Sequence, residues 1–189
     1  MIEGFPRSAN TFSVVAFQQA QHRPVEIAHH LHAIAQVVSG VRQGIPVIVL
    51  IRKPEDSLRS LRVMFKQRGD DAALKRWIRF YTAIAGMRDK VVIAEFSRVI
   101  ADFGTVIDEV NAKFGTAYAR FEATPENIKA VYDEIDLINE RSHHTSHGGK
   151  SMYVARPTEA KRQAHAKVEF KFDKDLLAQA HALYAELTA

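Results

Sequence analysis

The chain has 189 residues, of which 47% are hydrophobic, which fits one folded domain with a real core and excludes disorder. It contains no cysteine, which excludes disulfides, cysteine zinc sites and thiol catalysis, and its formal net charge of +4 suits an anionic small molecule as well as a nucleic acid. No apolar leader follows Met1 and the longest apolar run, 45–51, is too short to span a bilayer, so we expect a cytoplasmic protein without a signal peptide.

Strand-like and helical periods alternate along the chain. Strands are expected at 2–5, 25–28, 46–51 and 91–94, and helices at 11–21, 33–43, 70–88, 98–114 and 173–187 and from residues 54 and 124. This alternation predicts an α/β fold of three-layer P-loop type, with a central, mainly parallel sheet of four or five strands flanked by helices. We expect one domain over 1–189, in which 117–189 is the mostly helical part, and a ligand at the carboxyl ends of the strands.

The segment 4–11, Gly-Phe-Pro-Arg-Ser-Ala-Asn-Thr, follows the first expected strand and begins a helix. It has the length of the phosphate loop G-x-x-x-x-G-K-[ST], with Ala9 for the second glycine and Asn10 for the lysine. Backbone amides at such a helix start attract an anion, and Arg7 supplies a cation in place of the lysine. The pattern alone supports a phosphate site and a plain strand–turn–helix capped by Ser8 about equally.

A second segment, 51–60, lies at the carboxyl end of the most strongly predicted strand and reads Ile-Arg-Lys-Pro-Glu-Asp-Ser-Leu-Arg-Ser. Arg52 is the first residue after the expected strand, and Ser60 lies two turns into the helix that follows. Both side chains are within reach of one phosphate. Taken singly, each is better interpreted as a surface arginine or a helix serine.

The two segments together resemble the PAPS-dependent sulfotransferase family, in particular its small bacterial-type members. Residues 5–12 look like the family's 5′-phosphosulfate loop, Y-P-K-S-G-T-T-W, and 52–60 look like its 3′-phosphate motif, R-N-P-K-D-x-x-x-S. A weaker match at 96–103 resembles Y-E-D-L-x-x-D-P. The resemblance covers residues 2–116 and implies 3′-phosphoadenosine 5′-phosphosulfate (PAPS) as donor, adenosine 3′,5′-bisphosphate (PAP) as product, and no metal.

The resemblance also implies which residues bind the donor. They are those of the two motifs: Arg7, Ser8, Ala9, Asn10, Thr11, Phe12, Arg52 and Ser60. Arg7 stands where the family has a lysine, and its guanidinium can hold the bridging and sulfuryl oxygens in a bidentate manner. Ala9 replaces a glycine, and Phe12 replaces a tryptophan that stacks on adenine.

The family's general base is a histidine just after the second strand, and 29–32, His-His-Leu-His, occupies that position. If the strand at 25–28 continued, His30 and His32 would share one face. An exposed helix start or a metal pair would explain the cluster too, but no third ligand is evident nearby. We expect His32 to be the catalytic base, because 32–36 resembles the H-x-P-A-Q of some bacterial members, with His30 as the second choice and Arg7 as the catalytic cation.

Many members close over the nucleotide with an R-K-G loop, which is missing here. The nearest candidates are 148–150 (Gly-Gly-Lys), Arg156, Lys161 and Arg162, although solvated charge is the simpler interpretation for each. His143, His144 and His147 fit a polar loop better than a metal cluster.

We therefore expect a sulfotransferase acting on a hydroxyl or amine of a small-molecule, carbohydrate or lipid acceptor, with neither nucleic acid nor membrane as partner. Two alternatives remain open. One is a small-molecule kinase that uses ATP and magnesium, against which Asn10 and the absence of an aspartate at a strand end count. The other is a sulfotransferase-like protein that binds a nucleotide without turnover.

Overall fold

Three parallel strands form the sheet in the computed structural model, which describes residues 1–65, 69–141 and 155–189. They are β1 (Ile2–Gly4), β2 (Ile48–Ile51) and β3 (Val92–Glu95), arranged in the order β1-β2-β3. Ile48 of β2 pairs with Ile2 on one side and with Val92 on the other. The central strand is buried throughout, as its run of β-branched and aliphatic residues predicts.

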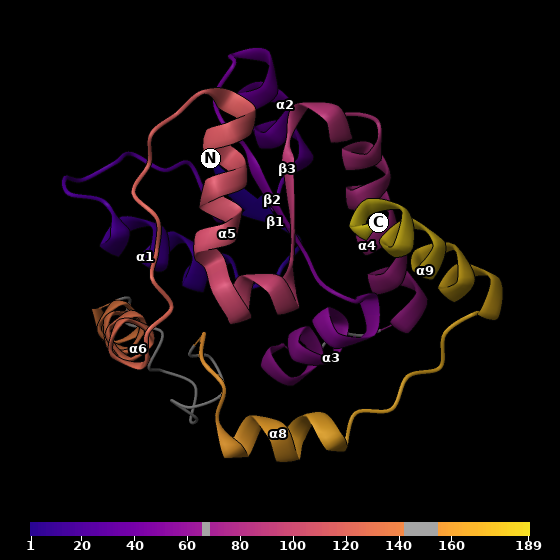
Figure 1. Cartoon of the computed structure of the whole chain (residues 1–189). Coiled ribbons are helices and arrows are strands. Elements are labelled where there is room, and N and C mark those ends of the chain that lie inside the picture. The colour runs from indigo at the N-terminus through magenta and orange to yellow at the C-terminus, as the bar shows by residue number, and fades with distance from the viewer. Residues whose placement is uncertain (66–68, 142–154) are drawn as a thin grey trace.

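Helices cover both faces of this sheet (Figure 1). One face carries α1, α5 and α6, and the other carries α2, α3, α4 and α9. The bounds of the helices are α1 (Asn10–Ala20), α2 (Ile34–Arg42), α3 (Pro54–Met64), α4 (Asp70–Ala85), α5 (Phe96–Phe114), α6 (Pro125–Arg141), α8 (Glu159–Ala166) and α9 (Lys174–Thr188), with a short 3-10 helix, η1, at Arg88–Lys90.

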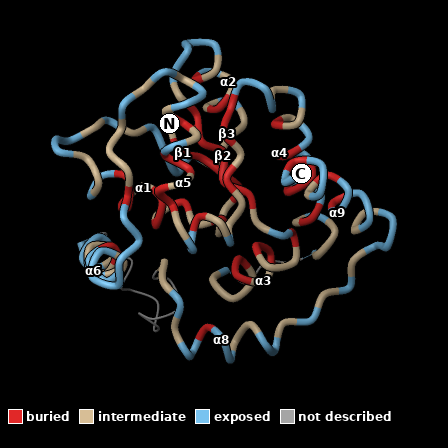
Figure 2. The backbone as a smooth tube through the Cα atoms, viewed as in Figure 1, coloured by how far each residue is buried: buried red, intermediate tan, exposed pale blue. Residues whose placement is uncertain are grey.

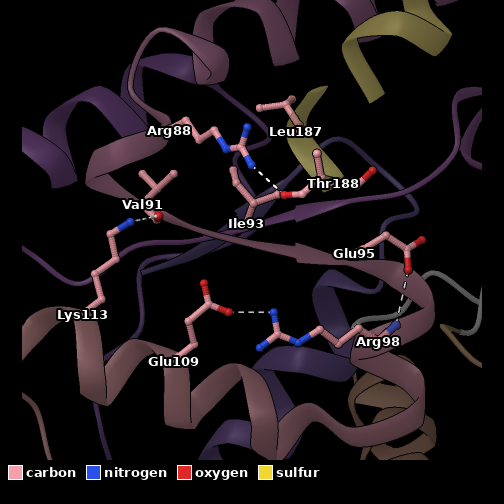
Figure 3. Close-up of a pocket in the computed structure, with 10 residues that line it drawn as sticks. Arg88, Val91, Ile93, Glu95, Arg98, Glu109, Lys113, Leu187 and Thr188 are labelled. Atoms are coloured by element: carbon pink, nitrogen blue, oxygen red, sulfur yellow. Dashed lines mark hydrogen bonds and ion pairs between the residues drawn. The ribbon is translucent and has the colours of Figure 1, made fainter. Parts of the chain in front are cut away.

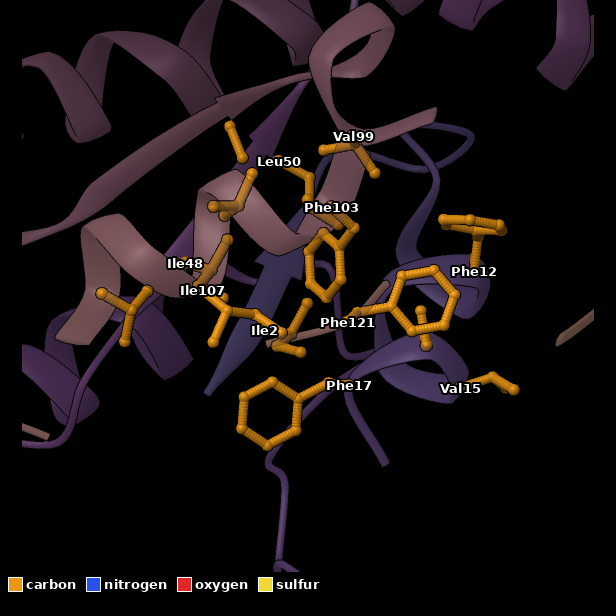
Figure 4. Packing of buried hydrophobic residues seen from close by; sticks show 14 of the residues in the cluster. Ile2, Phe12, Val15, Phe17, Ile48, Leu50, Val99, Phe103, Ile107 and Phe121 are labelled. Carbon is orange, nitrogen blue, oxygen red and sulfur yellow. The ribbon is translucent and has the colours of Figure 1, made fainter. Parts of the chain in front are cut away.

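The core consists of two apolar layers, one on each face of the sheet. Alternate residues of β2 divide between them: Ile48 and Leu50 pack with α1 and α5, whereas Val49 and Ile51 pack with α3 and α4. Figure 4 shows the first layer, where Phe103 and Ile107 of α5 lie beside these strand residues. Strands β1 and β2 are buried throughout, and β3 alternates between buried and partly buried residues (Figure 2). The three-layer arrangement and the parallel sheet are as expected.

The number of strands differs from the expectation. Four or five were expected, but the described residues form a sheet of three, and 25–28 is not a strand. That segment touches β1 only through a bridge between His29 and Ile2 and a hydrogen bond of 3.1 Å from the Ile2 amide to the Ala28 carbonyl. The backbone then turns left-handed at His30 (φ 62°) and His32 (φ 51°), which ends any extended pairing. The prediction that these two histidines share a strand face is therefore wrong.

The helix ends follow the expected signals closely. The Asp173 carboxylate caps α9 by accepting from the amides of Asp175 and Leu176 at 3.0 and 2.9 Å, and the Thr124 hydroxyl accepts from the Asn127 amide at 3.2 Å at the start of α6. Helix α4 ends at Ala85, three residues earlier than expected. Within the described ranges, no helix is long and apolar enough to cross a membrane.

Candidate anion-binding site

A cavity of about 910 Å³ lies where the carboxyl ends of the three strands meet. Each strand contributes to its wall the residues that follow it: Pro6 and Arg7 after β1, Arg52 after β2, and Phe96 after β3. Helices α3, α6 and α8, which surround the lower part of the molecule in Figure 1, supply the other walls. The cavity is thus at the edge of the sheet where parallel α/β folds bind ligands.

The charge of this cavity is of one sign. No aspartate or glutamate is among the described residues that line it, whereas the cations of its wall are Arg7, Arg52, Arg76, Arg156, Lys161 and Arg162. Two of them are paired with carboxylates outside the lining, Arg156 with Asp136 and Arg162 with Glu159, whereas Arg7 and Arg52 form no ion pair within the described residues. Cations held together in a partly buried wall repel one another, and a bound anion relieves that repulsion. The cavity is therefore built for a negatively charged ligand.

The loop between β1 and α1 borders this cavity through Pro6, Arg7 and Ala9. Two of its residues are left-handed, Arg7 (φ 73°) and Ala9 (φ 71°). A left-handed residue other than glycine costs about 1–2 kcal/mol, so the loop stores strain. Within the described part of the chain, none of the amides of residues 7–12 donates a hydrogen bond. These free amides at the positive end of α1 form a concave anion receptor.

The core holds the loop in place from behind. The Tyr81 hydroxyl, fully buried, donates to the Leu50 carbonyl at 2.8 Å and accepts from the Phe5 amide at 3.3 Å. The Asn10 amide group donates to the Phe5 carbonyl at 3.2 Å. The Ser8 hydroxyl lies 3.5 Å from the Tyr81 hydroxyl, and Ser8 does not line the cavity. Any contact of Ser8 with a ligand is therefore limited to its backbone amide.

The structure brings Arg7, Arg52 and Ser60 together, as the sequence predicts. Arg7 Nε donates to Ser60 Oγ at 2.9 Å, and Arg52 Nη1 donates to the Arg7 carbonyl at 3.1 Å. The Arg52 guanidinium lies 4.0 Å from the centroid of the Phe96 ring, and its Nε is buried without a hydrogen-bond partner in the described chain. Burial lowers the pKa of Arg7, and the adjacent Arg52 lowers it further.

Phe12 occupies a different environment from the one expected. Its side chain is buried among apolar residues of α1, α5 and α6, with ring centroids 6.5 Å from Phe121 and 5.9 Å from Tyr132. It also borders the cavity. Adenine stacking on Phe12 stays a prediction, and Phe96 and Tyr132 are further aromatic rings in the same wall.

The two candidate bases both line the cavity, but their ring nitrogens differ in availability. His30 Nε2 lies 3.0 Å from Thr11 Oγ1, and its Nδ1 contacts Nδ1 of His29. Desolvation in the cavity wall, and then the neighbouring His29 and His32, lower the pKa of His30 to about 4. His32 Nδ1 lies 2.7 Å from the Gly4 carbonyl oxygen, which can only accept, so this nitrogen carries the proton of the neutral ring. Its Nε2 has no hydrogen-bond partner in the described chain and is the unprotonated nitrogen.

The C-terminal part adds cations that the sequence indicated only weakly. Helix α8 begins with Thr158 as its cap and places Lys161, Arg162 and His165 in the cavity wall, next to Arg156. Lys161 is buried, and its ammonium donates to the Arg156 carbonyl at 2.9 Å. His165, which sequence reasoning missed, has a buried Nε2 without a partner among the described residues. The candidates at 143–150 lie outside the described residues.

We expect anion affinity to depend on pH through Lys161. Burial, then the charges of Arg7 and Arg156, lower the pKa of Lys161 to about 8. Between neutral pH and pH 8 the ammonium is largely charged, so sulfate affinity should change little. Above pH 8 sulfate binding must first restore that proton, so affinity should fall by up to about tenfold per pH unit.

Calorimetric titration with sulfate, which stays a dianion over this range, measures the effect. The Lys161→Arg variant is the control, because its charge does not titrate and its profile should be flat above pH 8. The same fall in the variant would contradict the assignment to Lys161.

A second pocket, of about 370 Å³, lies along the edge strand β3, between α5 and the end of α9, and includes the last residues of the chain (Figure 3). Its lining includes carboxylates, and its cations already have a carboxylate or a backbone carbonyl as partner. Arg98 Nη1 contacts Glu109 Oε2 at 2.6 Å, Lys113 Nζ donates to the Val91 carbonyl at 2.7 Å, and Arg88 Nη1 donates to the Glu186 carbonyl at 2.7 Å. It is therefore a weaker candidate than the cationic cavity. No cluster of three or more metal-ligating side chains occurs within the described residues.

The comparisons with known proteins bear on the fold. No model of a protein family matches the chain, and no curated protein matches it. Among solved structures it resembles mouse sulfotransferase SULT7A1 complexed with PAP, with a TM-score of 0.52 and 10% sequence identity, over 98% of this chain and 82% of that chain. At this identity the likeness shows the fold alone. The chain has a sulfotransferase-like α/β fold, which confirms that part of the expectation.

Proposed function

We propose that this protein is a cytoplasmic PAPS-dependent sulfotransferase, of the small bacterial type that its motifs resemble. The observation that carries the proposal is the cavity lined by cations and free loop amides, without a carboxylate among its described lining residues, at the carboxyl ends of the strands. It lies in a fold shared with a sulfotransferase that was solved with PAP. Two arginines from the two motifs, Arg7 and Arg52, meet there.

In this proposal the donor's two phosphates bind at the two motifs. The 5′-phosphosulfate is held by the amides of 7–12 and by Arg7, with Thr11 and Asn10 beside it. The 3′-phosphate is held by Arg52 and Ser60. Arg7 contacts Ser60, so the residues proposed for the 5′-phosphosulfate and those proposed for the 3′-phosphate are neighbours. The two motifs would therefore border one continuous anion site. Lys161 and Arg162 of α8 supply the charge that the family's R-K-G loop would give.

The reaction is an in-line transfer at sulfur. His32 Nε2 takes the proton of the acceptor hydroxyl, the acceptor oxygen forms a bond to sulfur, and the bond between sulfur and the bridging oxygen of the 5′-phosphate breaks. Arg7 and the loop amides stabilise the negative charge that develops on the leaving phosphate of PAP. Because cations and amides already surround that phosphate, the proposed chemistry needs no metal.

His32 is preferred to His30 as base on two grounds. The unprotonated Nε2 of His32 has no partner within the described chain, whereas both ring nitrogens of His30 contact other side chains. The pKa of His30 of about 4 also makes it a weak proton acceptor at neutral pH.

The choice of nucleotide separates this proposal from the kinase alternative. A donor with phosphates at both ends matches both motifs, whereas Mg²⁺ prefers carboxylate ligands, which the described lining residues lack. We expect PAP at about 100 times its Kd to raise the free energy of unfolding by about 2.7 kcal/mol, measured by thermal or chemical unfolding. At the same concentration, ATP–Mg²⁺ and adenosine 5′-monophosphate should stabilise less. Equal or greater stabilisation by ATP–Mg²⁺ would favour the kinase.

A further inference from the structure

Glu3 is a buried carboxylate whose presence the fold does not explain. It is the middle residue of β1 and has an exposed fraction of 0%. A carboxylate in such a position costs free energy unless a charge or a hydrogen bond compensates it. Its compensation must therefore be sought among the groups that contact it.

The group that contacts Glu3 is His32. Glu3 Oε2 accepts a hydrogen bond of 2.6 Å from the His32 backbone amide. Glu3 Oε1 has no hydrogen-bond partner within the described chain and lies 3.8 Å from His32 Nδ1. One carboxylate oxygen thus fixes the backbone of His32, and the other faces its ring.

These contacts stabilise two features of His32 that are unfavourable on their own, its backbone conformation and the charge of its protonated ring. First, its left-handed backbone, at φ 51°, is unfavourable for a residue with a side chain, and the hydrogen bond to Glu3 compensates it. Second, the ring becomes positively charged when Nε2 accepts a proton, and a carboxylate near Nδ1 stabilises that charge. The Gly4 carbonyl, 2.7 Å from Nδ1, orients the ring but carries no net charge.

We propose that Glu3 is a positioning residue for His32: it fixes the His32 backbone and stabilises the imidazolium that forms when Nε2 takes a proton. The inference rests on the proposed function, in which His32 is the base. Glu3 touches neither donor nor acceptor, because it does not line the cavity. Its effect must therefore appear in His32 and in turnover, and not in donor binding.

The test is the Glu3→Gln variant, which keeps the shape and one acceptor oxygen but removes the charge. Nitrogen NMR of the histidine rings over a pH series should show the His32 ring losing its second proton at a lower pH in the variant than in the wild type, because the charge that stabilises the imidazolium is gone. The Gly4 carbonyl should hold the neutral ring in the Nδ1–H form in both. PAP affinity, measured by calorimetry, should be unchanged. Turnover with PAPS and an acceptor from a panel of alcohols and phenols should fall about 10–100-fold in kcat, with little change in KM for PAPS.

Three controls separate positioning from mere stability. Glu26→Gln makes the same change on an exposed residue and should alter nothing. Glu3→Asp keeps the charge and should keep the His32 ring protonation close to that of the wild type, with intermediate turnover. In a His32→Ala background, Glu3→Gln should have no further effect on turnover, because the residue it acts through is absent.

Two results would overturn the inference: an unchanged protonation of the His32 ring across the pH series in Glu3→Gln, or the same loss of turnover in the His32→Ala background. Failure of the proposed function looks different, since the wild type would then either not bind PAP or bind it without transferring a sulfuryl group to any acceptor. The NMR comparison needs no acceptor and decides the role of Glu3 in either case.

Discussion

Replacing His32 with alanine should lower sulfuryl transfer about 10²–10⁴-fold, equivalent to about 3–5 kcal/mol of transition-state stabilisation, while PAP affinity stays the same. The free Nε2 is the atom proposed to take the acceptor's proton. The variant also loses the hydrogen bond from Nδ1 to the Gly4 carbonyl, but Gly4 does not line the cavity. PAPS turnover and PAP calorimetry on the same preparation measure the two quantities.

His30→Ala is the matched control for that variant. It removes an imidazole whose ring centroid lies 5.8 Å from that of His32, in the same cavity wall. With its pKa of about 4 and both ring nitrogens engaged, His30 should contribute far less to turnover. A dead His30→Ala with an active His32→Ala would reverse the ranking, and two fully active variants would place the base elsewhere.

Arg52→Ala should weaken PAP binding by about 1.5–3 kcal/mol for each charged hydrogen bond that it removes. The guanidinium is already oriented by the Phe96 ring and the Arg7 carbonyl, so the side chain loses little conformational entropy when a phosphate binds. Because the 3′-phosphate is bound equally in ground and transition states, KM for PAPS should rise more than kcat falls.

One further variant and one further ligand test the assignment of Arg52. Arg79→Ala removes the same charge from an exposed position of α4 outside the cavity wall and should leave PAP affinity unchanged. Adenosine 5′-monophosphate, which lacks the 3′-phosphate, should bind Arg52→Ala and the wild type alike. An unchanged PAP affinity in Arg52→Ala would remove the 3′-phosphate assignment.

The parts of this structure that follow from local pattern could be predicted from the sequence. The aliphatic run of β2 is buried on both faces, Pro54 begins α3, and the segment after β1 becomes a loop that opens α1. The position of Arg52 followed from the same reasoning, because a residue directly after a central parallel strand lies at the ligand-binding edge.

Features that depend on the path of the backbone could not be predicted in this way. The segment 25–28 has the composition of a strand, but left-handed residues at His30 and His32 end it, and nothing in residue alternation indicates a positive φ for histidine. Phe12 borders the cavity, and its burial against Phe121 and Tyr132 could not be seen in the local pattern.

Features that depend on distant contacts were also beyond local pattern. A lone glutamate in a short strand indicates a solvent-facing position, so the burial of Glu3 against His32, 29 residues away, carried no local signal. Lys161 was a candidate only through its charge and His165 was missed, and a helix near the C-terminus brings both beside Arg7. The clustering of lysine, arginine and histidine at 156–165 was the only available indication.

The central claim is that the chain moves a sulfuryl group, and the most direct measurement follows ³⁵S from labelled PAPS onto an acceptor. Purified protein is incubated with the label and a broad panel of alcohols, phenols, amines and carbohydrates, and both labelled product and PAP are quantified. The account predicts acceptor-dependent labelling with one PAP formed for each product, abolished in His32→Ala and in Arg7→Ala. Binding of PAP without any labelled product across the panel, or phosphorylation of an acceptor from ATP–Mg²⁺, would contradict it.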